Sequence, residues 1–300
     1  MLSNRRSICL LEILLLAIPF AMAFSVQAQT SSPAPSPVVA PAAKKRPSLE
    51  REFFKNILRD QKAIWTSPLH LRAKDARWLV PLGLGTAALI ATDQQTGDKI
   101  AESDKALHAS RIISYPGSAY STGAIAAGFY LFGRATHNDR ARETGLLAGE
   151  ALIDSAIVAT SIKAVTQRTR PTGGRSRSDF FDGGSSFPSG HSIKAWALAT
   201  IIANEYHEKT AVQVAAYGIA AAVSVSRFTG RSHYLSDVLI GSAMGYGIGR
   251  YVYRTHHRKA TVSGGGPEEE TRFRSTLWPA IVPDYNRHAR QYGVALSWSF

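Results

Sequence analysis

Three short blocks of the chain carry most of its recognisable chemistry: KAVTQRTRP at residues 163–171, FPSGHS at 187–192 and SRFTGRSHYLSD at 226–237. Within the first block, Lys163 and Arg170 are seven positions apart. Two turns of helix would therefore place both side chains on one face. Two cations on one face predict a site that binds an anion.

The second block has the pattern of a helix start. Pro188 and Ser189 precede an apolar run over 193–203, and we expect Ser189 to cap the helix. Gly190 would let backbone amides approach an oxyanion, which places His191 beside the same anion.

The third block pairs His233 with Asp237, four positions later. On a helix the carboxylate could bond one imidazole nitrogen, fix the tautomer and leave the other nitrogen free as a nucleophile. Arg227 adds a planar cation suited to phosphate oxygens. Each block alone also fits a solvated helix face, a capped turn or a structural His–Asp pair. Their combination in one order favours a single site.

These residues resemble the three-part signature of the type 2 phosphatidic acid phosphatase superfamily, which also contains bacterial non-specific acid phosphatases and vanadium haloperoxidases. The resemblance covers about residues 145–250. It implies an all-α fold, a multi-helix bundle, and metal-independent hydrolysis of phosphomonoesters through a phosphohistidine.

Position by position, the resemblance implies that His233 is the nucleophile, Asp237 its orienting partner and His191 the general acid. The phosphoryl oxygens would be held by Lys163, Arg170, Ser189, Gly190 and Arg227. No metal and no cofactor is expected, because the cations compensate the charge on the equatorial oxygens. Arg231, in the polar stretch before His233, either binds substrate or faces water, and surface statistics favour water.

The N-terminal segment predicts export. Residues 1–28 combine Arg5 and Arg6 with an apolar stretch over 8–24 and small residues up to Ala28, as in a cleaved secretory signal. An uncleaved membrane anchor is the alternative. Cys9 is the only cysteine, so the mature chain would have no disulfide or thiolate site. Residues 29–47 are a Pro/Ala-rich linker.

The rest of the chain predicts a helical phosphatase domain over 48–255. An amphipathic helix near 53–65 would pack on the bundle or lie on a membrane surface. Six apolar helices follow, near 78–92, 119–134, 144–165, 192–204, 211–226 and 235–253. Most apolar runs are shorter than the roughly 20 residues that cross a bilayer, and the longest contains Glu150 and Asp154. We therefore favour a periplasmic globular bundle, with membrane attachment or integral insertion left open.

Two connecting segments have open interpretations. The loop 172–187, with Phe180 and Phe181, is a substrate lid or a solvated connector. Residues 256–274 form a linker, where His256 and His257 fit a solvated helix end better than a metal site. In 275–300, a period-two pattern predicts a strand that forms a hairpin with 275–283 and packs on the bundle.

Composition limits the class of partner. The chain has 300 residues, 45% of them hydrophobic, and a formal charge of +13, enough for one substantial core and an attraction to phosphorylated lipids or small phosphoesters. No motif supports nucleic-acid binding. The oligomeric state is not indicated.

The expected function is a phosphatase acting on envelope lipid phosphates or pyrophosphates. Alternatives are a non-specific acid phosphatase on soluble phosphoesters, a haloperoxidase with vanadate on His233, and a non-catalytic envelope-binding protein. The signature specifies how phosphate is held and leaves the attached group open.

Overall fold

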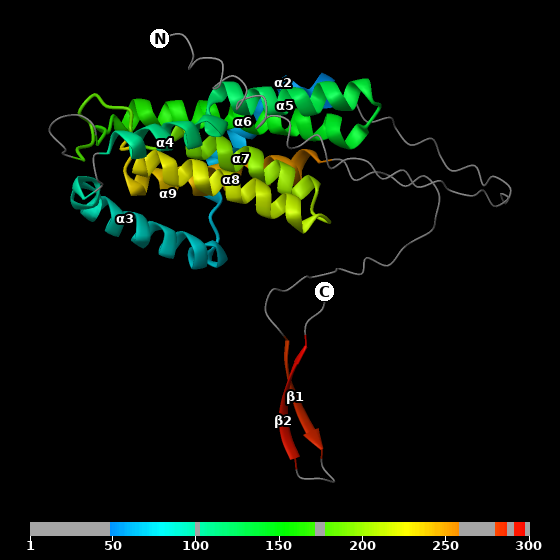
Figure 1. The fold of residues 1–300 in the computed structure, drawn as a ribbon. Helices are drawn as coiled ribbons and strands as arrows, with labels where there is room; N and C mark the ends of the chain where they lie inside the picture. The colour runs from blue at the N-terminus through cyan, green and yellow to red at the C-terminus, as the bar shows by residue number, and fades with distance from the viewer. Residues whose placement is uncertain (1–48, 100–102, 172–177, 258–279, 287–290, 298–300) are drawn as a thin grey trace. The chain divides into compact units, whose positions relative to one another are not determined.

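The computed structural model describes residues 49–99, 103–171, 178–257, 280–286 and 291–297 (Figure 1). The chain divides into two compact units, residues 1–257 and 258–300. The expected signal segment, the Pro/Ala-rich linker and nearly all of the second linker lie outside the described residues.

The described part of the first unit is helical. Its α-helices are α2 (Leu49–Thr66), α3 (Ala76–Asp98), α4 (Asp104–Ser114), α5 (Ala119–Ala135), α6 (Asp139–Thr166), α7 (Gly190–Glu205), α8 (Thr210–Thr229) and α9 (Leu235–His256). Short 3-10 turns are η2 (Ser67–His70), η3 (Ala73–Asp75) and η4 (Tyr115–Gly117). The all-α fold and the six apolar helices are confirmed. Helix α4 was not expected, because its sequence, DKALHASRIIS, is largely polar.

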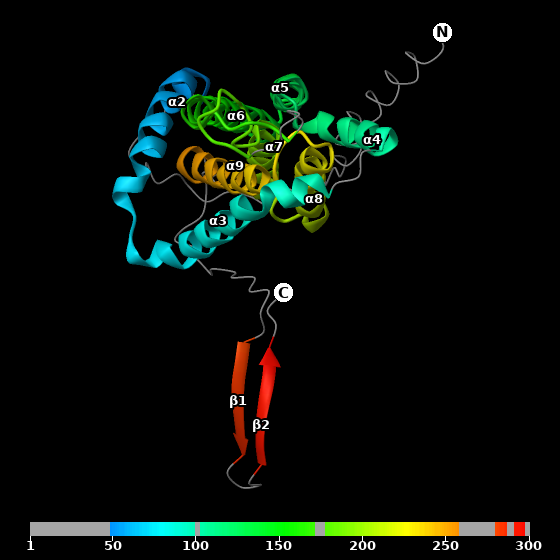
Figure 2. The same ribbon diagram turned by 90° about the vertical axis from the view of Figure 1, so that its left-hand side faces the viewer.

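The core lies where α6, α7 and α9 meet. α7 is surrounded by α6, α8 and α9, and Figure 2 shows this arrangement nearly along the helix axes. The buried cluster contains Leu147 and Ala151 of α6, Ile201 of α7 and Val252 of α9. Alanine-rich faces let these helices approach closely, and the site lies at the C-terminal end of α6 and the N-terminal ends of α7 and α9.

Glycines set the distance between α7 and α9. A Cβ atom on Gly245 would lie 2.2 Å from the carbonyl oxygen of Ile193, and one on Gly249 would lie 2.7 Å from that of Ala197. Neither space accommodates a side chain, so the two backbones are in direct contact. This contact brings the first turn of α9 against the start of α7, where the Ser189 amide donates to the Asp237 carbonyl at 3.0 Å.

Helix α2 packs on the bundle, against α6 and α9, as one of the two interpretations predicted. The buried face differs in part from the apolar one: Asn56 and Asp60 are buried beside Ile57, whereas Phe54 and Leu58 are 77% and 73% exposed. The apolar periodicity identified the buried face only in part: Ile57 is buried and Ile64 packs against the core, but α6 also presents polar partners to Asn56 and Gln61 of α2.

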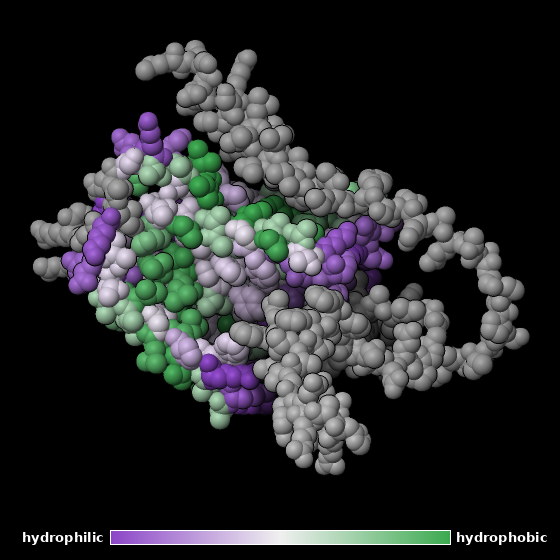
Figure 3. Space-filling model, turned by 60° about the horizontal axis from the view of Figure 1, so that its bottom comes forward, coloured by the Kyte–Doolittle hydropathy of each residue, from purple (hydrophilic) through white to green (hydrophobic). Residues whose placement is uncertain are grey.

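Helix α3 contacts α9 along one side and leaves apolar residues exposed on another. Trp78 and Leu84 of α3 are 72% and 68% exposed, as are Val214 and Val225 of α8 at 67% and 59%. Figure 3 shows hydrophobic residues gathered on the face turned toward the viewer, with hydrophilic ones at its margins. Apolar residues gathered on one exposed face are typical of a surface that contacts a partner or a membrane.

Two of the described helices, α6 and α8, are long and apolar enough to cross a membrane by length and composition. In α6, 56% of the most apolar stretch is buried inside the protein, as in the core helix of a bundle. In α8 the buried share is 22%. The length test is therefore weak evidence of a span for α6.

The second unit contains an antiparallel hairpin of β1 (Ala280–Asn286) and β2 (Gln291–Ser297). The register pairs Ala280 with Ser297 and Asn286 with Gln291. The expected hairpin is present among the described residues, and residues 275–279 of its expected first strand lie outside them. Its packing on the bundle stays a prediction.

Candidate active site

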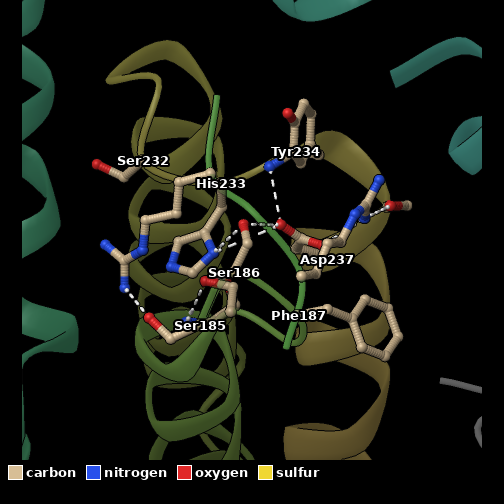
Figure 4. A network of polar contacts seen from close by, with 12 residues as sticks. Ser185, Ser186, Phe187, Ser232, His233, Tyr234 and Asp237 are labelled. Atoms are coloured by element: carbon tan, nitrogen blue, oxygen red, sulfur yellow. Dashed lines mark hydrogen bonds and ion pairs between the residues drawn. The ribbon is translucent and has the colours of Figure 1, made fainter. Parts of the chain in front are cut away.

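His233 and Asp237 are adjacent, but they do not lie on one helix as the spacing suggested. α9 begins at Leu235, so His233 precedes it and Asp237 lies in its first turn. The Asp237 Oδ2 atom accepts the Tyr234 amide at 3.0 Å and is 3.6 Å from the His233 Nδ1 atom (Figure 4). The pair is thus built at a helix start, where the carboxylate also satisfies a free backbone amide.

A further residue, Ser186, completes the contact. Its hydroxyl donates to Asp237 Oδ2 at 2.5 Å and lies 3.5 Å from His233 Nδ1 (Figure 4). His233 is 3% exposed and Asp237 is fully buried. Burial alone would raise the pKa of Asp237, but the His233 contact, the Arg168 charge and the Ser186 bond lower it below its usual value. The carboxylate therefore stays ionised and can hold the imidazole.

Arg168, which no sequence pattern singled out, fixes the other oxygen of Asp237. Its Nη1 atom donates to Asp237 Oδ1 at 2.5 Å, and its Nη2 atom donates to Asp93 Oδ2 of α3 at 2.8 Å. The guanidinium is fully buried under the rings of Phe180 and Tyr234, with centroid distances of 4.7 and 4.5 Å. The block QRTRP offers two arginines, and only the structure shows which one binds this carboxylate.

Lys163 and Arg170 do not share a helix face, which corrects the prediction from their spacing. α6 ends at Thr166, and Gln167 has the left-handed conformation with φ 43°, so Arg170 lies in the loop beyond the helix. Both cations still converge, because the loop turns back on itself. Lys163 Nζ donates to the Ser185 carbonyl at 2.5 Å, and Arg170 Nη2 donates to the Ser185 hydroxyl at 3.3 Å.

The PSGH block forms the helix start that was predicted. Ser189 is the N-cap of α7, and its hydroxyl accepts from the Ser192 amide. Next to it, a Cβ atom on Gly190 would meet only Lys194 Nζ at 3.8 Å and Lys163 Cε at 3.9 Å. The first turn of α7 therefore faces two lysines. Lys194 was missed because it falls within the apolar run that predicted the helix.

Arg227 adds a fourth cation from the end of α8. Its Nη1 atom donates to the Ser114 hydroxyl of α4 at 3.2 Å, and its buried Nε atom has no partner among the described residues. Arg231, four residues on, is half-buried with φ 52°, so the expectation that it faces water is not met.

The electrostatics of the site favour the binding of an anion. Burial, together with the charge of the nearby Arg170, lowers the pKa of Lys163 to about 8. Burial, then the charges of Arg227 and Lys194, lower the pKa of His191 to about 3. Burial lowers the pKa of His233 to about 4, although the contact with Asp237 opposes this shift. Cations that disfavour one another's charge are stabilised together when an anion binds among them.

The match to known proteins agrees with this geometry. The segment 144–260, which contains all three blocks, matches the model of the PAP2 superfamily. Residues 144–260 belong to the PAP2 superfamily.

The lipid A 1-phosphatase of Porphyromonas gingivalis is 32% identical over 106 residues, which are 35% of this chain. The match spans about a quarter (24%) of that protein's length.

Two solved structures are similar. One is the first transmembrane PAP2 type phosphatidylglycerolphosphate phosphatase from Bacillus subtilis (TM-score 0.45, 23% identity, 58% of this chain and 94% of that chain). The other is Aquifex aeolicus LpxE (TM-score 0.41, 19% identity, 51% of this chain and 88% of that chain).

The aromatic residues of the loop after the first block separate into two kinds. Phe180 packs against Phe187 and covers Arg168, so it belongs to the support of the PAP2 site. Phe181 is 76% exposed. Residues 172–177 of the loop lie outside the described part of the chain.

The end of α9 is not a solvated helix end, contrary to expectation. The His256 Nε2 atom is 2.9 Å from both carboxylate oxygens of Asp60, and the His257 Nδ1 atom is 3.2 Å from Glu143 and from Glu205. Each histidine contacts its own group of carboxylates, because His256 ends α9 and His257 lies just beyond it.

Proposed function

We propose that the chain is a metal-independent phosphatase that hydrolyses phosphomonoesters or pyrophosphates through a phosphohistidine on His233. The observation that carries this proposal is the convergence of Lys163, Lys194 and Arg227 on the start of α7, next to a histidine held by a buried carboxylate. Such an arrangement supplies the positive charge that phosphoryl transfer requires on three equatorial oxygens.

The proposed reaction has two steps. The Nε2 atom of His233, which has no hydrogen-bond partner among the described residues, attacks phosphorus and displaces the leaving oxygen, which takes a proton from His191. Water then attacks the phosphohistidine, gives its proton to His191 and releases inorganic phosphate. Asp237 keeps the Nδ1 proton of His233 in place throughout, so the same nitrogen stays reactive.

His191 must be protonated to act as the acid, although its pKa in the unliganded site is only about 3. A bound phosphoryl dianion offsets the charges of Arg227 and Lys194, which removes part of the cause of that low value. We therefore propose that substrate binding itself raises the pKa of His191 and makes it a general acid.

We propose envelope lipid phosphates as substrates. The named relative acts on lipid A, and the exposed apolar residues of α3 and α8 suit association with a lipid surface. The N-terminal segment supports export to the periplasm or cell envelope. A soluble phosphoester substrate is the alternative. The phosphate cradle, formed by Lys163, Arg170, Lys194 and Arg227, would bind the phosphoryl group and leave the attached group unspecified.

The test is phosphate release from phosphatidate in EDTA, with wild-type protein and His233→Ala in the same detergent. Turnover by the wild type alone supports a metal-independent phosphohistidine. Turnover of a soluble aryl phosphate, without turnover of phosphatidate, would replace the lipid by the soluble alternative. Equal activity of both proteins would contradict the role of His233.

A further inference from the structure

A second group of ionisable residues lies between α2, α6 and α9, remote from the catalytic histidines. It consists of Asp60, Glu150, Asp154 and His256, here named the acidic cluster. The three carboxylates are fully buried, and the His256 side chain is 9% exposed. Glu150 precedes Lys163 by 13 residues on α6, about 20 Å along the helix axis, so the cluster is distinct from the phosphate cradle.

The geometry of the acidic cluster is that of a ligand set. One oxygen of Asp60, one of Glu150 and one ring nitrogen of His256 all lie within 4.8 Å of one another. Asp154 lies within hydrogen-bonding reach of Asp60. Three helices therefore direct an imidazole and carboxylates at one small volume.

The donors around the cluster do not satisfy its oxygens. Asn56 donates to Glu150 Oε1 at 3.0 Å, and Gln61 donates to Asp154 Oδ1 at 2.8 Å. His256 is shared between both oxygens of Asp60. Glu150 Oε2 and Asp154 Oδ2 are buried without a partner in the part of the chain that the structure describes. Unpaired, fully buried carboxylate oxygens are rare, because they forfeit solvation without a replacement.

The charge balance points to the same deficit. Three buried carboxylates face one histidine, so the cluster has more potential negative than positive charge. A divalent ion would supply the positive charge that is short and would give the free oxygens a partner.

We propose that the acidic cluster binds one divalent transition-metal ion, with Zn²⁺ as the preferred ion. Mixed imidazole and carboxylate ligands suit Zn²⁺, whereas Mg²⁺ prefers an all-oxygen shell that retains water. His256 would give up its proton contact with Asp60 and offer Nε2 to the metal, and Asn56 and Gln61 would orient the carboxylates from outside. The ion would fasten α2 to the bundle.

The test uses untagged full-length protein, treated with EDTA, dialysed against Zn²⁺ or Mg²⁺, and measured by metal analysis and thermal unfolding. We expect about one Zn²⁺ per chain. We also expect a Tm higher by several degrees in Zn²⁺, because an ion that binds only the folded state stabilises it, and a smaller effect of Mg²⁺. Glu150→Gln and Asp154→Asn should each weaken Zn²⁺ binding by more than the roughly 10–100-fold that loss of an outer-shell partner causes.

Two controls locate the ion. His207→Gln changes a histidine whose side chain is 75% exposed, and it should leave Zn²⁺ binding unchanged. Glu205→Gln changes the neighbouring cluster of Glu143, Glu205 and His257, and it should also bind Zn²⁺ as the wild type does.

Three results would overturn the proposal: substoichiometric Zn²⁺ with an unchanged Tm in the wild type, full binding by both Glu150→Gln and Asp154→Asn, or loss of binding only in Glu205→Gln. The wild-type measurement decides even if a variant fails to fold. The outcome is independent of the proposed function, which is assayed in EDTA at a temperature where the metal-free protein is folded.

Discussion

Arg168 is the residue through which the catalytic pair is connected to the rest of the bundle. It bridges Asp237 and Asp93 with one planar group, and Ser236 bonds both Arg168 and Asp93. A lysine could bond one carboxylate but not span both in the same plane. Arg168 is therefore a positioning residue that acts on His233 through Asp237.

We predict that Arg168→Lys lowers kcat by about 10–100-fold, the size typical of a lost outer-shell partner, and changes KM little. The reason is that Asp237 loses its fixed orientation while the phosphate cradle is intact. Steady-state kinetics measure both constants, and the acidic limb of the pH profile should move as the Asp237 contact to His233 weakens. Arg134→Lys, at an exposed site of α5, is the matched control. A rise in KM alone would place Arg168 in substrate binding instead.

The depressed pKa values of the two histidines predict the pH dependence of the reaction. In the enzyme without substrate, the pKa of His233 is about 4. On the acidic side kcat/KM should therefore fall only near that pH, and not near 6.5. On the basic side, kcat should fall as His191 loses its proton in the complex, and His191→Gln should abolish that limb. The measurement is a pH series of both constants. An acidic limb near 6.5 would contradict the electrostatic account of the cradle.

At the scale of elements, local patterns predicted the helices well and their joining poorly. Alanine-rich runs predicted α5 to α9 because apolar periodicity is a local property. The spacing of Lys163 and Arg170, and that of His233 and Asp237, was interpreted as helical, whereas both pairs span a helix end. Their convergence depends on a loop reversal and on the packing of α9 against α7. Such long-range contacts leave no periodic signal in the sequence.

Buried polar residues account for the remaining misses. Lys194 lies in an apolar run, and Asp93 lies in α3, far along the chain from its partner Arg168. Asn56 and Asp60 of α2 are buried although hydropathy places them outside. In each case a partner from another helix reverses the preference of the residue for water, and one sequence does not identify that partner.

The direct contact between α7 and α9 predicts that Gly245→Ala destabilises the protein by about 1–3 kcal/mol, as overpacking generally does. The added Cβ atom would lie 2.2 Å from the Ile193 carbonyl and 2.9 Å from the Trp196 side chain, so the helices must separate. Gly247 lies two residues further along, on a different face of the same helix. A Cβ atom there meets no atom within 4 Å, so Gly247→Ala should be neutral or slightly stabilising. Denaturant unfolding compares the two. Equal effects would mean that helix propensity, and not the contact, governs the response.

At the scale of the whole molecule, two groups of buried ionisable residues oppose each other in their effect on stability. His191 and His233 have lowered pKa values, so the unfolded chain binds their protons first and stability falls as pH drops from about 6.5. Glu150, Asp154 and Glu205 have raised pKa values. Their contribution is present below their ordinary pKa and is lost as pH rises to about 7. The metal-free protein should therefore be most stable in mildly acidic solution.

The last prediction separates the carboxylates from the cation proposed to bind them. In EDTA, Glu150→Gln should match the wild type near pH 5, where Glu150 is already neutral in the folded protein. At pH 8 the variant should be more stable by on the order of 2 kcal/mol, because glutamine avoids a buried charge. In Zn²⁺ the order should reverse, since the wild type gains the energy of metal binding and the variant does not. Unfolding in denaturant at both pH values, with EDTA or Zn²⁺, tests this. A variant that is less stable than the wild type under all four conditions would show that Glu150 acts through its bond to Asn56 alone.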